Sequence, residues 1–271
     1  MALLVGDCFE KVKEIESEVV QTCVTSPPYW GLRDYEDDEQ LGQEAHPEEF
    51  IGRLVDLFKE IKRILRDDGT VWVNIGDTYF GAKGGHFDSK NSLTYSDTGT
   101  KYRESRKAPP KHPYLKVKDL IGVPWMFAVA MQKDGWYLRQ DIIWHKPNPM
   151  PEAVNDRCAK SHEHIFLFSK KKQYFFDADA IRTNTNARMR DVWSMNTASF
   201  GGAHFAVFPD KLPETCIKAG TKEGDIVFDP FMGSGTTAQV AQRLGRKWIG
   251  IELNPKYAEI INGKTAQGEL F

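Results

Sequence analysis

The chain has 271 residues, a formal net charge of −2, 41% hydrophobic residues and 27% charged residues. These values are typical of a soluble globular protein with a sizeable core, and the charge excludes binding of polyanions through a global excess of basic residues. There is no run of 18 apolar residues and no signal peptide, because the N-terminal apolar stretch already ends at Asp7, so we expect no membrane partner.

Strands and helices are predicted to alternate along most of the chain. Apolar runs bounded by turn residues predict strands at 2–6, 19–25, 70–77, 136–145, 164–169, 225–231 and 247–252. Helical spacing and helix-end signals predict helices at 9–16, 49–65, 119–132, 209–220, 236–245 and 255–262. This alternation indicates an α/β fold with a parallel sheet.

The cysteines show no Cys-x-x-Cys pair and no metal-binding spacing. They are Cys8, Cys23, Cys158 and Cys216. We expect reduced thiols in a cytoplasmic protein and no metal site. The run His162-Glu163-His164 resembles a metal site only superficially, because alternating polar positions on a strand explain it better.

Two polar segments interrupt the alternation of strands and helices. Residues 81–118 carry nine Lys and Arg against three Asp and Glu, which predicts either a solvated insertion or a mobile basic arm that closes over a phosphate backbone. Residues 170–206 begin with three lysines and contain Arg182, Arg188 and Arg190 beside two asparagines. Arg and Asn suit bidentate contacts with base edges, although they are also ordinary surface residues.

A glycine loop follows the strand at 225–231. In FDPFMGSGTTA, Gly233 and Gly235 permit a tight turn, and the amides of the next helix would face a ligand. Thr236 stands where a P-loop needs lysine, which argues against nucleoside triphosphates. Gly233, Gly235 and Ala238 satisfy the dinucleotide-binding pattern Gly-x-Gly-x-x-Ala, and Glu252 is placed to bind ribose hydroxyls. The remaining alternative is a plain tight turn.

The residue before this loop distinguishes between cofactors. Asp229, at the end of the strand, would repel a pyrophosphate but favour a cation. S-adenosylmethionine carries a cationic sulfonium and an α-amino group and has no phosphate. The loop therefore fits S-adenosylmethionine better than NAD.

The stretch VTSPPY (24–29) resembles the catalytic tetrapeptide of DNA amino-methyltransferases, and DPFMGSGTT (229–237) resembles their S-adenosylmethionine loop. The catalytic stretch comes first and the cofactor loop last, as in the circularly permuted β group of that family. The Ser-Pro-Pro-Tyr form is most similar to the cytosine-N4 branch. The resemblance implies a single methyltransferase domain over 1–271 with a Rossmann-like sheet, in which both chain ends complete one site.

The resemblance also implies site residues and partners. Cofactor contacts are expected at Asp7, Cys8, Phe208, Asp229, Pro230, Phe231, Gly233, Gly235, Thr236, Thr237 and Glu252. Phe205 and Ala206 are expected near the methionine end of the cofactor, and 170–206 holds the position of the target-recognition region. The expected partners are double-stranded DNA and a companion restriction endonuclease, in the cytoplasm of a prokaryotic cell or encoded by a phage.

The Ser-Pro-Pro-Tyr stretch suits methylation of an exocyclic amine. Hydrogen bonds from the amine to Ser26 Oγ and the Pro27 carbonyl would turn its lone pair toward the methyl carbon, while Pro27 and Pro28 stiffen the strand end. Tyr29 can stack on the base. No cysteine follows the prolines, so a cytosine-C5 mechanism through a covalent intermediate is excluded.

A duplex base must be flipped out to reach such a site. Trp30 and Tyr35 are candidate walls of the base pocket, and Lys146 is a candidate phosphate contact. Asp77 either lines the pocket or caps a helix.

Three alternatives to a cytosine-N4 methyltransferase stay open. The same fold can act on adenine N6, an NAD-dependent oxidoreductase would use the glycine loop alone, and a DNA-binding module could have lost catalysis. The sequence does not predict the oligomeric state.

Overall fold

The computed structural model describes residues 1–31, 40–81, 111–152, 154–197 and 208–266. The strands are β1 (Ala2–Val5), β2 (Val20–Thr25), β3 (Leu65–Ile75), β4 (Tyr137–His145), β5 (His162–Ser169), β6 (Val192–Ser194), β7 (Ile226–Asp229) and β8 (Lys247–Glu252). The helices are α1 (Cys8–Lys11), a 3₁₀ turn (Val12–Glu14), α2 (Pro47–Ile64), α3 (Val123–Lys133), α4 (Lys211–Gly220), α5 (Thr236–Arg243) and α6 (Pro255–Ala266).

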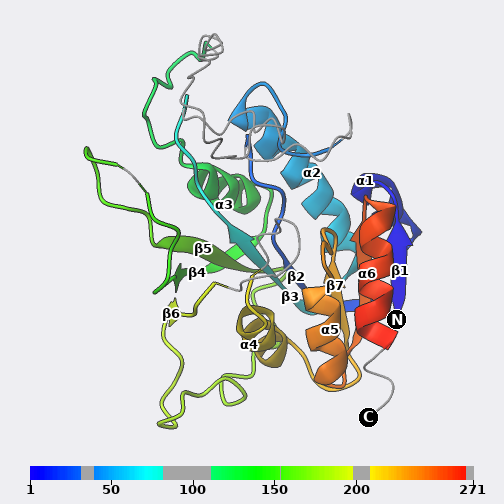
Figure 1. The fold of residues 1–271 in the computed structure, drawn as a ribbon. Helices are drawn as coiled ribbons and strands as arrows, with labels where there is room; N and C mark the ends of the chain where they lie inside the picture. Colours follow the sequence, from blue (N-terminus) through cyan, green and yellow to red (C-terminus); the bar gives the residue numbers. More distant parts are fainter. Residues whose placement is uncertain (32–39, 82–110, 153, 198–207, 267–271) are drawn as a thin grey trace, which may run out of the picture.

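The strands form one sheet in the order β1-β8-β7-β2-β3-β5-β4-β6 (Figure 1). Strand β5 is antiparallel to both of its neighbours, β3 and β4, while the other pairings are parallel. The prediction of a parallel sheet was therefore wrong at β5. Strand β4 connects to β5 without a crossover helix, and such a return to the neighbouring position requires an antiparallel pair.

Both ends of the chain contribute to one side of this sheet. Strand β1 pairs with β8, and β2 pairs with β7, so the first two strands flank the last two. Figure 1 shows β1 and α6 side by side near the N-terminus. The expectation that the chain ends lie together is confirmed.

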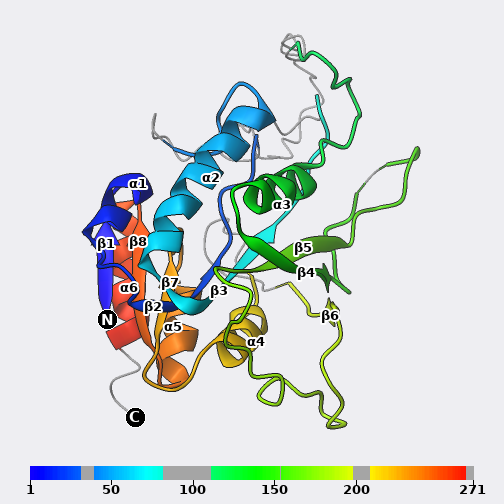
Figure 2. The same ribbon diagram turned by 180° about the vertical axis from the view of Figure 1, so that it is seen from behind.

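Helices cover both faces of the sheet (Figures 1 and 2). Helices α1, α2 and α3 pack on one face, where α2 buries a stripe that includes Leu54, Phe58 and Ile61. Helices α4, α5 and α6 cover the other face through residues such as Ile217 and Ala238. The apolar residues recur at helical spacing, so each helix turns one side toward the sheet.

Most predicted elements are present, with shifted ends. Helix α2 ends at Ile64 and β3 begins at Leu65, so the strand predicted at 70–77 starts five residues earlier than expected. Pairing of Leu65 with Val20 extends the strand back to the helix. A Cβ on Gly69 would lie 2.6 Å from Leu65 Cγ, so this close packing requires glycine there.

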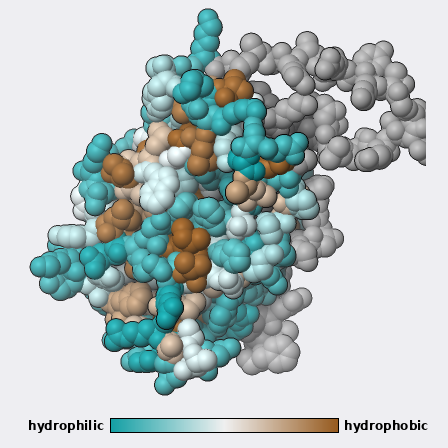
Figure 3. Space-filling view, turned by 90° about the vertical axis from the view of Figure 1, so that its left-hand side faces the viewer, coloured by the Kyte–Doolittle hydropathy of each residue, from teal (hydrophilic) through white to brown (hydrophobic). Residues whose placement is uncertain are grey.

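Strand β6 was missed, because it has only three residues and lies within the polar segment 170–206. It forms one edge of the sheet, and Figure 3 looks onto the corresponding side of the molecule, where hydrophilic residues separate small apolar patches. Short edge strands offer little template for pairing with other chains. Within the described ranges, no helix combines the length and apolarity needed to cross a bilayer.

Candidate active site

The catalytic stretch and the cofactor loop meet at the carboxyl ends of β2 and β7. Thr25, the last residue of β2, donates its hydroxyl to Asp229 Oδ1 at 2.7 Å across 204 positions of the chain. Parallel pairing of Cys23 with Phe228 sets this register. The contact places Ser26 directly beside the glycine loop, and sequence analysis gave Thr25 no role.

Asp229 organises the loop that follows it. Its carboxylate also accepts hydrogen bonds from the Thr237 hydroxyl at 2.7 Å and the Phe231 amide at 3.0 Å. Only 1% of Asp229 is exposed, and burial raises the pKa of its carboxyl to about 6, against the lowering effect of these donors. Two oxygens offer about four acceptor sites, so three donors leave capacity for one more.

The glycine loop has the tight turn that its sequence predicts. Gly233 and Gly235 have φ of 54° and 83°, in the left-handed region where glycine is favoured. A Cβ on Gly235 would lie 3.1 Å from Ile261, so the turn also packs closely on α6. Helix α5 begins at Thr236, and its first amides lie at the same end of the sheet as Asp229.

Glu252, at the end of β8, braces the same loop. Its carboxylate accepts hydrogen bonds from the Gly233 amide at 2.7 Å and the Asn254 amide at 2.9 Å. Burial raises the pKa of Glu252 despite these two donors. At the end of β1, Asp7 caps α1 through the amide of Phe9, and burial raises the pKa of the neighbouring Cys8 thiol to about 12.

Three carboxylates at this edge of the sheet fit S-adenosylmethionine and not a pyrophosphate. The carboxylates of Asp7, Asp229 and Glu252 follow β1, β7 and β8, which are adjacent in the sheet. Asp229 and Glu252 are buried, so a cation beside their ionised carboxylates would be stabilised and a phosphate repelled. Phe208, expected at the methionine end, packs on the apolar cluster beneath α4 and α5. Phe205 and Ala206 lie outside the described residues.

The Ser-Pro-Pro-Tyr stretch follows the end of β2 and forms neither helix nor strand. Ser26 and Tyr29 are half-buried and Pro27 is buried. The Tyr29 hydroxyl donates to Glu163 Oε2 at 2.5 Å, and its ring lies against Gly76. This role of Glu163 was not predicted from the sequence, because the His-Glu-His pattern was interpreted as the polar outer positions of a strand.

The other candidates for the base pocket have varied surroundings. Trp30 Nε1 donates to the Glu44 carbonyl at 3.0 Å, which fixes the indole beside the start of α2. Lys146 is ion-paired with Glu163 and lies over the Trp144 ring at 4.4 Å. Tyr35 lies outside the described residues.

Asp77 caps a helix that is distant in sequence. Its carboxylate accepts hydrogen bonds from the amides of Gly122 and Val123 at the start of α3, at 3.0 and 3.1 Å, and from Thr78. The side chain of Lys160 donates to the Asp77 carbonyl. The helix-cap alternative is thus present in the structure, and these bonds engage the carboxylate that was also considered for the base pocket.

The basic residues of 170–206 are not gathered at this edge. Residues after β5 leave from the opposite end of the sheet, because β5 is antiparallel, and they run below β6 and α4 in Figure 1. Arg182 bonds to Asp179 and to the Asn186 carbonyl within that loop, and its DNA contact stays a prediction. Arg188 and Arg190 are exposed. Strand β6 then returns toward the carboxyl edge.

The polar insert 81–118 is anchored at both ends. The Phe80 amide donates to the Asp119 carbonyl, the Phe80 carbonyl accepts from the Lys118 amide, and Leu115 is buried against the core. Residues 82–110 lie outside the described residues, so a basic arm there stays a prediction.

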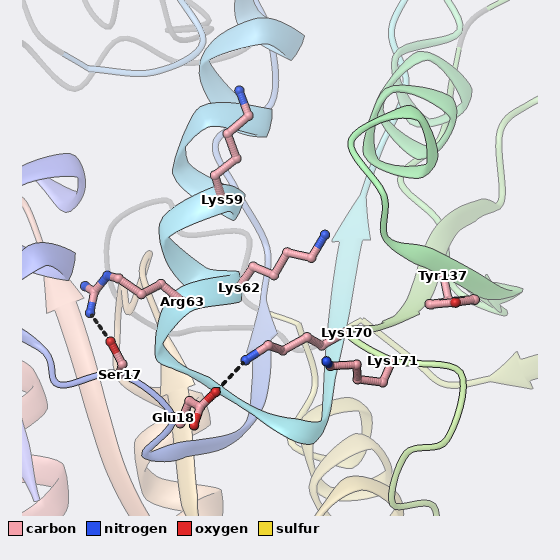
Figure 4. A pocket seen from close by; sticks show the side chains of 8 residues that line it. All are labelled: Ser17, Glu18, Lys59, Lys62, Arg63, Tyr137, Lys170 and Lys171. Atoms are coloured by element: carbon pink, nitrogen blue, oxygen red, sulfur yellow. Dashed lines mark hydrogen bonds and ion pairs between the residues drawn. The ribbon is translucent and has the colours of Figure 1, made fainter.

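A surface hollow at the amino end of the sheet does not form a second site. Figure 4 shows its lining, which is mostly cationic, with Arg63 bonded to Ser17 and Lys170 to Glu18. Lys62 donates to the carbonyls of Asp134 and Gly135. These cations take part in hydrogen bonds and ion pairs within the protein, so the hollow is lined by groups that stabilise the fold.

Comparison with known proteins identifies the family. A model of the DNA methylases that modify N6 or N4 amines matches residues 20–263, nearly the whole chain. The chain belongs to this family. It is a DNA methyltransferase that uses S-adenosylmethionine, as the resemblance in Sequence analysis implied.

Relatives in bacteria cover nearly the whole methyltransferase. It is 48% identical to the type II methyltransferase M.Cfr9I of Citrobacter freundii, over 98% of this chain and 88% of that protein. It is also 48% identical to M.SmaI of Serratia marcescens, over 95% of this chain and 88% of the relative.

Solved structures share the fold. The cytosine-N4-specific PvuII DNA methyltransferase superposes with a TM-score of 0.73 at 23% identity, over 97% of this chain and 85% of that one. A putative DNA modification methylase of Thermus thermophilus, complexed with S-adenosyl-L-methionine, has a TM-score of 0.65 at 25% identity, over 98% and 93%.

Proposed function

We propose that the methyltransferase modifies the N4 amine of cytosine in duplex DNA, after the base has flipped out of the stack. The observation that carries this proposal is the Thr25–Asp229 hydrogen bond, which sets the Ser-Pro-Pro-Tyr stretch beside the cofactor loop. The serine in that stretch and the resemblance to the cytosine-N4 branch support cytosine over adenine. The flipped base is required because the amine is otherwise enclosed in the duplex.

The proposed mechanism uses few groups of the protein. Ser26 Oγ and the Pro27 carbonyl accept hydrogen bonds from the amine and direct its lone pair along the line of transfer. S-adenosylmethionine supplies an activated methyl group on a cationic sulfonium. The amine nitrogen bonds to the methyl carbon, the carbon–sulfur bond breaks, and the amine releases one proton to solvent. Tyr29 stacks on the base and sets its plane.

The remaining residues hold the cofactor and shape the pocket. Asp229 and Glu252 supply negative charge for the amino group and hydrogen-bond acceptors for the ribose. Supporting contacts are proposed at Asp7, Cys8, Phe208, Pro230, Phe231, Gly233, Gly235, Thr236 and Thr237. Trp30 and Tyr35 are proposed for the walls of the base pocket, while Asp77 caps α3.

The motif order supports a circularly permuted arrangement. The catalytic strand β2 precedes the cofactor strand β7 in the chain, yet the two are neighbours in the sheet. A permuted methyltransferase needs this adjacency, because the site must join residues from both chain ends.

DNA contacts and target choice are assigned to the segments around the sheet. We place phosphate contacts at Lys146 and a basic arm within 81–118. Target recognition belongs to 170–206, with Arg188 and Arg190 exposed there. Exchange of this segment with that of a relative is expected to move the recognition site. A companion restriction endonuclease in the same prokaryotic cytoplasm would cleave the unmodified site.

The target base is tested by nucleoside mass spectrometry. The purified protein is incubated with labelled S-adenosylmethionine and duplex DNA from a methylation-deficient host, and the DNA is digested to nucleosides. N4-methylcytosine is the expected product. N6-methyladenine would agree with the family but overturn the choice of base. The absence of label from every nucleoside would overturn the proposed activity.

A further inference from the structure

We propose that Glu163 is a positioning residue that holds the Tyr29 ring in place for the flipped base, an inference that rests on the proposed stacking role of Tyr29. Glu163 lies at the carboxyl edge of the sheet, next to the end of β3. It touches none of the cofactor loop residues in the hydrogen bonds described above. Glu163 would affect the rate of methyl transfer by setting the orientation of Tyr29.

Three donors from three segments converge on this one carboxylate. The Tyr29 hydroxyl and the Asn74 amide bond to Oε2 at 2.5 and 3.0 Å, and the Lys146 ammonium bonds to Oε1. Only 12% of the Glu163 side chain and 18% of the Lys146 side chain are exposed. A shielded carboxylate with an ionic partner holds its geometry better than an exposed one.

The sheet itself fixes the position of Glu163. In the β3–β5–β4 register, Asn74 lies opposite Ile165 and Trp144 lies opposite Glu163. Alternation along the strands therefore puts Asn74, Glu163 and Trp144 on the same face. Lys146 is held over the Trp144 ring, so the cation that balances Glu163 is also restrained.

The Tyr29 ring has a second restraint that is independent of Glu163. A Cβ built on Gly76 would lie 2.6 Å from Tyr29 Cε2, so the ring rests directly against the glycine backbone. The hydroxyl is fixed by Glu163 and the ring edge by Gly76. The half-buried Tyr29 thus has one defined orientation at the site, as stacking on a base requires.

The first test compares methyl-transfer kinetics of Glu163→Ala and Glu163→Gln. Glu163→Ala is expected to lower kcat by about 10- to 100-fold, because misplaced catalytic groups cost rates of this order, with the KM for S-adenosylmethionine within about twofold. Glu163→Gln keeps an acceptor for the Tyr29 hydroxyl and is expected to restore part of kcat. The matched control is Glu214→Gln, a glutamate on α4 that pairs with Lys218 and is expected to leave kcat unchanged.

The second test combines Glu163→Ala with Tyr29→Phe. If Glu163 acts through the Tyr29 hydroxyl, the double variant is no slower than the slower single variant. Independent, multiplicative losses would overturn the proposal. If Tyr29→Ala retains normal turnover, the stacking role under Proposed function fails; if Tyr29→Ala is inactive while Glu163→Ala is normal, only the present inference fails.

The third test uses Gly76→Ala and remains informative if the Glu163 variants do not fold. The added methyl is expected to displace the ring and lower kcat at unchanged KM for S-adenosylmethionine. Gly52→Ala is the control, because a Cβ there meets nothing within 4 Å. A folded Gly76→Ala protein with wild-type kcat would overturn the restraint.

Discussion

The site has two halves: a cofactor half, at the ends of β7 and β8, and a base half, formed by the Ser-Pro-Pro-Tyr stretch with β3 and β5. The contacts within each half differ in how far apart their residues lie in the sequence. Around β7 and β8, Gly233 bonds to Glu252 only 19 residues away. Around β3 and β5, Tyr29 bonds to Glu163 across 134 residues. Local contacts therefore shape the glycine loop, although β1 joins the cofactor half from the other end of the chain, whereas the base half depends on the pairing of distant strands. The Thr25–Asp229 contact joins the two.

The largest expected effect separates the two halves by function. Ser26→Ala and Tyr29→Ala are expected to lower kcat by about 100-fold or more, because each removes a group that orients the reacting amine. The affinity for S-adenosylmethionine, measured by calorimetry, is expected to stay nearly unchanged. Loss of cofactor affinity in Tyr29→Ala would show that the halves are not separable.

The reciprocal change acts on the cofactor half. Asp229→Asn preserves the shape of the side chain but removes its charge, so the Kd for S-adenosylmethionine is expected to rise about 10- to 100-fold. Calorimetric titration measures the change. An unchanged Kd would mean that the cation lies elsewhere.

The pH dependence of cofactor binding sharpens the role of Asp229. Burial raises its pKa from 3.8 to about 6, and a cationic ligand favours the ionised carboxylate. Affinity for S-adenosylmethionine is therefore expected to be about tenfold weaker at pH 5 than at pH 7.5. Asp229→Asn should remove most of this dependence, and an equal dependence in both proteins would assign it to another group.

The same pKa shift has a consequence for the ligand-free protein. Since the folded-state pKa lies above the unfolded value, the folded protein binds the proton more tightly. The Asp229 contribution to the free energy of unfolding is then expected to decrease as the pH rises from about 4 to about 6. Denaturant unfolding of wild type and Asp229→Asn across this window measures the difference.

A smaller effect is expected where the two halves join. Thr25→Val removes the hydroxyl that bonds to Asp229 but keeps the size of the side chain, so the free energy of unfolding is expected to fall by about 1–2 kcal/mol. Thr185→Val, at an exposed position, is the control, with an expected change within about 0.5 kcal/mol. Equal changes in both variants would show that the contact does not join the halves.

The smallest expected effect lies outside the site. Gly52 is in the exposed face of α2, and a Cβ there meets no neighbour. Gly52→Ala is expected to stabilise the protein by about 0.5–1 kcal/mol, because alanine loses less conformational entropy in a helix. Thermal unfolding measures it, and destabilisation would contradict the described packing of α2.

The contrast between the halves explains what could be predicted from the sequence. Gly233, Gly235 and Asp229 were predicted because turn geometry and charge act over a few residues. The antiparallel β5, the short β6 and the role of Glu163 were missed, because each depends on which strands become neighbours. Helix capping was one of the two roles predicted for Asp77, but the capped helix, α3, starts 45 and 46 residues away and could not be identified from a local pattern.

The segment 170–206 shows the same limit. Its arginines suggested base contacts by composition, but the direction of β5 decides at which end of the sheet the segment starts. In the structure Arg182 bonds within its own loop, and its contact with DNA stays a prediction.

The central claim is that residues from both chain ends form one site at the carboxyl edge of the sheet. The most direct measurement is a crystal structure of the protein with an S-adenosylmethionine analogue and a duplex that contains its recognition site. We expect a flipped cytosine on the Tyr29 ring, with its amine bonded to Ser26 Oγ and the Pro27 carbonyl and facing the cofactor beside Asp229. A target base held away from Tyr29, or a cofactor away from the 229–237 loop, would contradict it.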